Sequence, residues 1–136
     1  MMVYFDTNIL LYAFIKDTDD KKQRDISVKL VEEAIDNNTL IISEVILCEF
    51  AFVSSKLNES KDDIDDNLEF LLTFLQPSNF SINQRMIEIL KETSLYVSSS
   101  DVSHLAFAEY HNAKLVTFDK GFKKLKNISN IEIDIK

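Results

Sequence analysis

The sequence has few of the residues on which several large classes of protein depend. Its 136 residues include one glycine, Gly121, and one cysteine, Cys48. Phosphate-binding loops and G-x-G-x-x-G turns need several glycines to bring the backbone close to a phosphate. A single cysteine cannot form an intramolecular disulfide framework or a cysteine zinc cluster. We therefore exclude nucleotide-binding enzymes of these two kinds and disulfide-stabilised domains.

Long apolar runs are also missing. No stretch approaches the roughly 20 apolar residues that a membrane helix needs, and the start of the chain reaches Asp6 without the basic segment of a signal peptide. These absences predict a cytoplasmic protein. A hydrophobic content of 46% is sufficient for a sizeable core, and the length predicts a single domain over residues 1–136.

The net charge is −8. A protein that grips nucleic acid through many phosphate contacts is usually basic, so this charge disfavours a sequence-reading DNA binder. It does not exclude an enzyme that meets phosphates through a bound divalent cation, because the ion inverts the local charge. It also suits a basic protein partner.

Apolar runs and helical patterns alternate along the chain. Strands are predicted at residues 2–5, 39–42, 80–82, 114–118 and 131–135. Helices are predicted at residues 8–15, 22–37, 43–57, 60–75, 84–96 and 98–112, with Ser43 and Ser60 as N-caps and residues 119–124 as a turn. This order is typical of an α/β sheet of parallel strands covered on both faces.

Four widely spaced acidic residues stand where an apolar run stops or a helix begins: Asp6, Glu49, Asp101 and Asp119. Ligands of open α/β sheets bind at the carboxyl ends of the strands, where the first and last of these acids are expected. Four converging carboxylates could not all stay ionised without a cation. Their oxygen atoms suit Mg²⁺ or Mn²⁺. The joint pattern predicts a metal-dependent enzyme that acts on phosphates.

Each acid alone has a simpler explanation. Asp6 suits the N-cap of the helix that follows it, and Glu49 suits the solvent edge of an apolar helix stripe. Asp101 suits the first turn of a helix, where the dipole favours a negative charge, and Asp119 suits the start of a turn. Only the four together favour a functional site.

Four blocks of the chain resemble, in order, those of a PIN domain, in particular the VapC-type toxin ribonucleases of type II toxin–antitoxin systems. The blocks are DTNIL at residues 6–10, ISEVILCE at 42–49, DVSHLAFA at 101–108 and LVTFDKGF at 115–122. The similarity covers essentially the whole chain. It implies a PIN-like three-layer α/β/α fold with a central, mostly parallel sheet of four or five short strands.

The resemblance also implies the site. The family's catalytic, metal-binding quartet matches Asp6, Glu49, Asp101 and Asp119. Asn8 matches the polar residue that helps to hold the first acid, and Thr117 the hydroxyl residue two positions before the last. Glu49 is chosen over Glu44 because the family places its glutamate well inside the helix.

By the same resemblance the protein is a Mg²⁺- or Mn²⁺-dependent endoribonuclease that hydrolyses RNA and leaves a 5′-phosphate. The family implies homodimers and inhibition by a small cognate antitoxin. Residues 17–24 and the helical segment 60–75 are candidate surfaces for that contact. The resemblance therefore implies the toxin of a toxin–antitoxin pair.

Two further features have two interpretations each. His104, three residues after Asp101, suits either a substrate contact or a histidine at the edge of the core. Four lysines follow the last acid and suit either RNA steering or a lysine-rich surface turn: Lys120, Lys123, Lys124 and Lys126.

Two other functions compete with cleavage. A PIN-like binding or scaffold protein without activity would be marked by a lost quartet, and all four acids are present. A signalling receiver domain has a similar length and architecture, but it needs paired acids after the first strand. Asp6 is followed by Thr7, so only one acid stands there.

Overall fold

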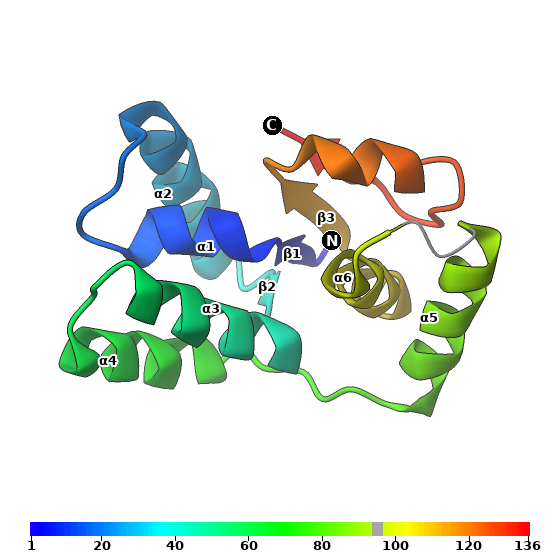
Figure 1. Cartoon of the computed structure of the whole chain (residues 1–136), viewed down its shortest axis with the longest axis horizontal. Helices are drawn as coiled ribbons and strands as arrows, with labels where there is room; N and C mark the ends of the chain where they lie inside the picture. Colours follow the sequence, from blue (N-terminus) through cyan, green and yellow to red (C-terminus); the bar gives the residue numbers. More distant parts are fainter. Residues whose placement is uncertain (94–96) are drawn as a thin grey trace.

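The computed structural model describes residues 1–93 and 97–136 (Figure 1). The elements follow in the order β1 (Val3–Phe5), α1 (Thr7–Phe14), α2 (Lys21–Asp36), β2 (Leu40–Ile41), α3 (Glu44–Lys56), α4 (Lys61–Leu72), α5 (Phe80–Glu92), α6 (Ser99–Tyr110), β3 (Lys114–Thr117), the 3₁₀ helix η1 (Lys120–Leu125) and β4 (Ile133–Ile135). The last three residues of the predicted helix 84–96, residues 94–96, lie outside the described residues.

The sheet has four strands in the order β2-β1-β3-β4, and every pair is parallel. Tyr4 of β1 is in register with Ile41 of β2 and Leu115 of β3. In Figure 1, α1 to α4 lie to the left of the strands and α5, α6 and η1 to the right. The predicted α/β fold with a parallel sheet is confirmed. Because the strands are parallel, their carboxyl ends meet at one edge.

Serine side chains begin three of the helices. Ser43, Ser60 and Ser98 accept hydrogen bonds from the backbone N–H groups of Ile46, Asp63 and Asp101. Each bond satisfies one of the free donors at a helix N-terminus. The predicted caps Ser43 and Ser60 are confirmed. Because Ser43 fixes the start of α3, it also helps to fix the direction in which Glu49 leaves this helix.

Asparagine ends helices in this glycine-poor chain. Asn38, Asn58 and Asn112 follow α2, α3 and α6 with φ of 55°, 62° and 50°. Asparagine is the residue other than glycine that most readily adopts this left-handed conformation. After α2 the turn is closed by the N–H of Thr39, which donates to the carbonyl of Ala34 at 2.9 Å. The chain thus reverses without glycine before it enters β2.

One predicted strand is wrong. Residues 80–82 form the first turn of α5, where the side chain of Asn79 accepts a hydrogen bond from the N–H of Ile82 at 3.0 Å. Ile82 is buried, but the side chain of Phe80 is 74% exposed. The alternation of apolar and polar residues was too short to distinguish a strand from a capped helix start.

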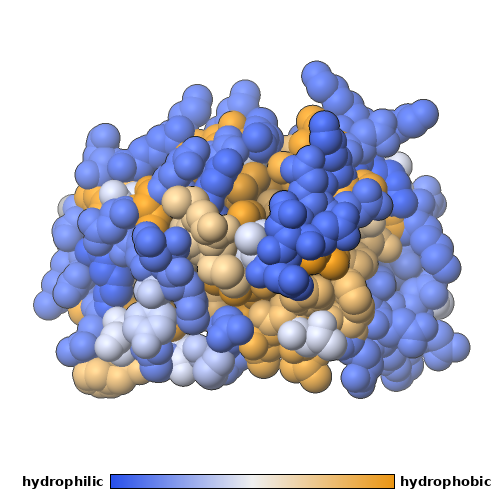
Figure 2. All heavy atoms as spheres, turned by 180° about the vertical axis from the view of Figure 1, so that it is seen from behind, coloured by the Kyte–Doolittle hydropathy of each residue, from blue (hydrophilic) through white to orange (hydrophobic). Residues whose placement is uncertain are grey.

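The core lies between the sheet and the helices. It includes Tyr4 and Phe5 of β1, Phe50 of α3 and Leu71 of α4, all at most 1% exposed. Leu72 of the same helix is 49% exposed, because it is adjacent to Leu71 and so lies well around the helix from it. Polar side chains cover much of the back face, with apolar groups between them (Figure 2).

Within the described residues, no helix combines the length and the apolar character needed to cross a membrane.

We expect Phe50→Ala to lower the free energy of unfolding by about 3–5 kcal/mol, because it leaves a cavity in the core. Phe52→Ala, on the same helix but 62% exposed, should cost less than about 1 kcal/mol, which includes its contact with Lys56. Urea denaturation of both variants measures the difference. Similar losses in the two variants would contradict the assignment of Phe50 to the core.

Candidate active site

Asp6 follows β1 directly and caps α1. Its backbone N–H donates to the carbonyl of Val116 in β3 at 2.9 Å. Its Oδ1 accepts the N–H of Thr7 at 2.7 Å, and its Oδ2 accepts the hydroxyl of Thr117 at 2.8 Å. Only 8% of the residue is exposed. A buried carboxylate needs such donors, and each oxygen keeps a further lone pair for a ligand.

Thr117 links the ends of two neighbouring strands. It is fully buried, and its hydroxyl donates to Asp6 while accepting the backbone N–H of Asp119 at 2.9 Å. Asp119 is exposed, and its Oδ1 accepts the N–H of Gly121 at 2.7 Å. A Cβ on Gly121 would lie 3.0 Å from that oxygen. The only glycine of the chain therefore stands where the last acid needs a close backbone donor.

Glu49 projects from α3 toward Asp6. Its Oε1 accepts the hydroxyl of Thr7 at 3.0 Å and lies 2.8 Å from Nε2 of His104. The same nitrogen is 3.6 Å from Oδ1 of Asp6. Glu44, by contrast, is an exposed residue in the first turn of α3. The structure thus brings Glu49 rather than Glu44 beside the first acid.

His104 lies beneath these two carboxylates. It is 1% exposed, so of its two interpretations the edge of the core is correct. Its Nδ1 lies 2.5 Å from the hydroxyl oxygen of Tyr4. Sequence reasoning missed Tyr4 and Thr7 as parts of the site. Tyr4 carried a usable signal, because residues two apart in a strand point to the same face, and Asp6 stands two positions after it.

Charges of the acids act on one another. Burial raises the pKa of Asp101 above its ordinary value, and the neighbouring charges of Asp119 and Asp6 raise it further. For Glu49, burial works to raise the pKa, but contact with His104 and the hydrogen bond from Thr7 outweigh it, so the pKa is lowered. The charges of Asp6, Asp101 and Asp119 therefore act on one another directly. The ionised form of Glu49 is instead stabilised by its contacts with His104 and Thr7.

The donor chemistry of this set fits a hard divalent cation. The ligands would be carboxylate oxygens, and the mutual repulsion that raises the pKa of Asp101 is what a cation relieves. Among residues 1–93 and 97–136, no three histidine, cysteine or acidic side chains are close enough together to hold an ion. Asp6 is already held by the fold, so binding would require the other carboxylates to turn inward.

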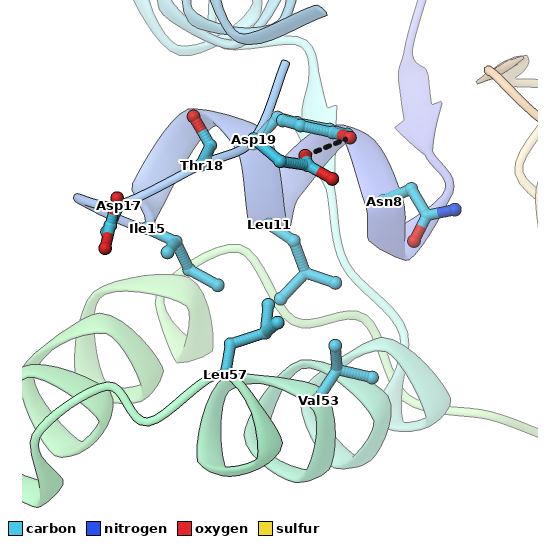
Figure 3. Close-up of a pocket in the computed structure, with 9 residues that line it drawn as sticks. Asn8, Leu11, Ile15, Asp17, Thr18, Asp19, Val53 and Leu57 are labelled. Carbon is cyan, nitrogen blue, oxygen red and sulfur yellow. Dashed lines mark hydrogen bonds between the residues drawn. The ribbon is translucent and has the colours of Figure 1, made fainter. Parts of the chain in front are cut away.

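Asn8 makes no hydrogen bond to this group among the described residues. It is an exposed residue. It borders a pocket of about 280 Å³ between α1, the loop that follows α1, and α3. Figure 3 shows Val53 and Leu57 pointing toward Leu11 on the apolar floor of this pocket. Its outer wall is acidic and includes Asp17 and Asp19.

The lysines predicted beside the last acid lie on η1 or directly after it. Lys120, Lys123, Lys124 and Lys126 are all exposed. None of them takes part in a salt bridge among those found within the described residues. They form a positively charged surface next to Asp119 on an otherwise acidic protein.

Comparison with known proteins identifies the class. The family model of the PIN domain matches residues 3–128, and the chain belongs to this family. A comparison with curated proteins found no match.

Among solved structures, VapBC2 from Rickettsia felis, bound to a DNA fragment from its promoter, is 26% identical with a TM-score of 0.73, covering 100% of this chain and 99% of that one. A toxin–antitoxin complex from Klebsiella pneumoniae is 22% identical with a TM-score of 0.63, covering 88% and 89%. FitAcB from Neisseria gonorrhoeae is 14% identical with a TM-score of 0.70, covering 98% and 96%. The last two likenesses concern the fold alone, whereas the first, together with the family model, supports a VapC-type PIN domain.

We expect Asp119→Asn to lower the pKa of Asp101, because it removes the largest of the neighbouring charges that raise it. A carboxyl whose pKa is raised on folding opposes folding when ionised. This cost is present above the raised pKa and disappears as the pH falls from the raised toward the ordinary value. A pH titration of the Asp101 carboxyl ¹³C signal measures the pKa. Asp62→Asn, on the exposed side of α4, should leave it unchanged, and the same result for Asp119→Asn would contradict the convergence of the acids.

Proposed function

We propose that the protein is a divalent-metal-dependent endoribonuclease and the toxin of a toxin–antitoxin pair. The observation that carries the proposal is that the buried carboxylate of Asp6 is held at the carboxyl edge of the sheet, beside Glu49. Asp101 lies close enough to Asp119 for the charge of Asp119 to raise its pKa. Membership of the PIN family supports a nuclease. The relatives whose structures are toxin–antitoxin complexes support the biological role.

In this proposal the four acids share the work of holding Mg²⁺ or Mn²⁺. Asp6 and Asp101 would bind the ion most directly, and Glu49 and Asp119 would complete its shell through an oxygen or a bound water. When bound, the ion supplies charge neutralisation for the phosphodiester and a lower pKa for the attacking water. Glu49 or Asp119 would accept a proton from that water. Hydrolysis by this route leaves a 5′-phosphate.

Thr117 and Thr7 have supporting roles that follow from their contacts. Thr117 holds Oδ2 of Asp6, and Thr7 donates its N–H to Oδ1 of Asp6 and its hydroxyl to Glu49. Each carboxylate is therefore oriented before any ligand arrives. A preorganised group loses little conformational freedom when it binds, which favours binding and catalysis.

The lysines after Asp119 would attract the RNA backbone. The acids of the site repel phosphates at long range, so a local positive surface beside them favours the approach of RNA.

A cognate antitoxin and a second copy of the chain are the proposed protein partners. The pocket beside Asn8 has an apolar floor and an acidic wall formed by part of the predicted contact segment 17–24, which suits a basic, partly apolar antitoxin segment. Exposed apolar residues on α3 to α5, such as Phe52, Phe70 and Phe80, are available for dimer contacts. The alternative is a PIN-like binding protein without activity.

We expect the purified protein to cleave total cellular RNA with Mg²⁺ or Mn²⁺ and not with EDTA. Asp6→Asn and Asp101→Asn should each reduce the rate by at least about 100-fold, because each removes a charge that the reaction needs. Gel analysis of the RNA measures cleavage, and circular dichroism checks the fold.

Glu49→Gln and Glu44→Gln form a matched pair for this experiment, because both glutamates lie on α3. Only the first should reduce cleavage. Metal-independent activity, or products that end in 2′,3′-cyclic phosphates, would reject the mechanism. No cleavage by a folded protein that binds Mn²⁺ would favour the binding-protein alternative.

Neutralising the lysine surface should raise the KM for RNA. Replacement of Lys120, Lys123, Lys124 and Lys126 by Gln together should raise it roughly 10-fold and flatten its dependence on salt, because fewer counterions are exchanged on binding. Steady-state kinetics at several salt concentrations measure both effects. The charge-matched control replaces four exposed lysines elsewhere: Lys29, Lys56, Lys61 and Lys91. Equal effects in the two variants would reject local steering.

A further inference from the structure

A chain of buried polar contacts runs under the site from the start of α3 to Glu49. The hydroxyl oxygen of Tyr4 lies 2.7 Å from Oγ of Ser43 and 2.5 Å from Nδ1 of His104. Nε2 on the other side of the imidazole ring lies 2.8 Å from Oε1 of Glu49. Tyr4, Ser43 and His104 are each at most 4% exposed. The contacts join β1, α3 and α6, which are far apart in the sequence.

With a neutral imidazole on His104, the protons along these contacts have one consistent direction. Oγ of Ser43 already accepts the N–H of Ile46 at 3.3 Å, so its own proton is free to point to Tyr4. Tyr4 is fully buried, and a phenol keeps its proton near neutral pH, so its hydroxyl has a proton to donate to Nδ1 of His104. Nε2 faces two carboxylates, which accept and do not donate, so it must carry the ring proton.

His104 is too deeply buried to contact RNA. Its Nε2 lies between Oε1 of Glu49 at 2.8 Å and Oδ1 of Asp6 at 3.6 Å. Although the first of these contacts is short, Nε2 takes part in no hydrogen bond of regular geometry among the described residues. A buried donor of this kind attracts both carboxylates toward one point.

We propose that His104 is a positioning residue that holds Glu49 beside Asp6, and that Tyr4 and Ser43 maintain its imidazole in the tautomer with the proton on Nε2. The positioning of a carboxylate for metal binding rests on the proposed function. Oε1 of Glu49 is then occupied by His104 and Thr7. No hydrogen bond among the described residues ends on Oε2, which leaves that oxygen for the ion or its water. Hydrogen-bond donors that contact a metal-binding side chain in this way orient metal ligands in many proteins.

The polar contacts from Ser43 to Glu49 also connect the site to the start of α3. Ser43 caps this helix, and Glu49 stands further along it. Both ends of the polar chain therefore act on the same helix and resist its rotation relative to β1 and α6. Loss of these polar contacts should allow Glu49 to turn away from Asp6 without unfolding the protein.

The first test uses the metal-free protein and nitrogen NMR of its two histidines. We expect the signals of His104 to show the tautomer with the proton on Nε2, and Tyr4→Phe to produce a mixture of tautomers. The signals are assigned by their loss in His104→Gln and their retention in His111→Gln, on the same helix. A proton on Nδ1 in the wild type would overturn the proposal whatever the protein's activity.

The second test is a double-mutant cycle with Mn²⁺ as the probe, measured by calorimetry. His104→Leu and Tyr4→Phe should each weaken Mn²⁺ binding about 10-fold. In a Glu49→Gln background each should change it by less than about 2-fold, because the group through which they act is gone. His104→Gln, which retains a donor near the position of Nε2, should recover most of the affinity.

Matched controls separate positioning from stability. Tyr110→Phe removes a hydroxyl from an exposed tyrosine of α6, and His111→Leu alters the other histidine. Neither should change Mn²⁺ binding. Equal losses with and without the Glu49 substitution would overturn the proposal, because they would show a general effect on the fold.

The outcomes also distinguish this proposal from the proposed function. Mn²⁺ binding that follows the predicted cycle, without RNA cleavage, would reject the nuclease and retain the positioning role. RNA cleavage by a protein with the other tautomer, or with no coupling in the cycle, would retain the nuclease and reject the positioning role. If the wild type binds no Mn²⁺, metal dependence fails and the tautomer measurement alone decides the role of His104.

Discussion

The buried carboxylate of Asp6 is the group on which the arrangement of the site depends. A negative charge at the end of a central strand is unfavourable unless donors surround it. The N–H of Thr7 and the hydroxyl of Thr117 supply them. Because Thr117 belongs to β3 and Asp6 follows β1, the same bond ties the carboxyl ends of the two central strands together. The remaining acids are arranged around this point by the helices that begin beside it.

The four acids differ in what surrounds their carboxylates. Asp6 and Glu49 are held by hydroxyl, amide and imidazole donors, which orient their oxygen atoms. Asp101 is affected chiefly by burial and by the charges of Asp119 and Asp6, which make its ionised form less favourable. One half of the site is therefore preorganised, and the other half carries electrostatic repulsion that a cation would relieve. This division is consistent with carboxylates that close only when an ion is present.

Much of the fold was predictable because the local signals agreed with one another. Serine caps and short apolar runs placed most helices and strands correctly. The strand predicted at residues 80–82 was wrong, because Asn79 offers a cap whose signal competes with the apolar alternation of three residues. The four acids could be selected by their blocks of sequence. The choice of Glu49 over Glu44 depended on the resemblance. In the structure, Glu49 lies beside His104 and Asp6, and Glu44 is exposed.

The sequence by itself determined the class of fold and the acids that end its strands or stand in the helices beside them. The class of fold follows from local periodicity, and the acids follow from the residue types at element boundaries. Only the tertiary structure decided which side chains meet. Tyr4, Ser43, His104 and Glu49 come from three elements, and up to 100 positions separate a contacting pair. Contacts of this range depend on how the elements pack, and packing is a property of the whole chain that no local pattern contains. The role of a buried histidine beneath two carboxylates therefore became visible only in the folded protein.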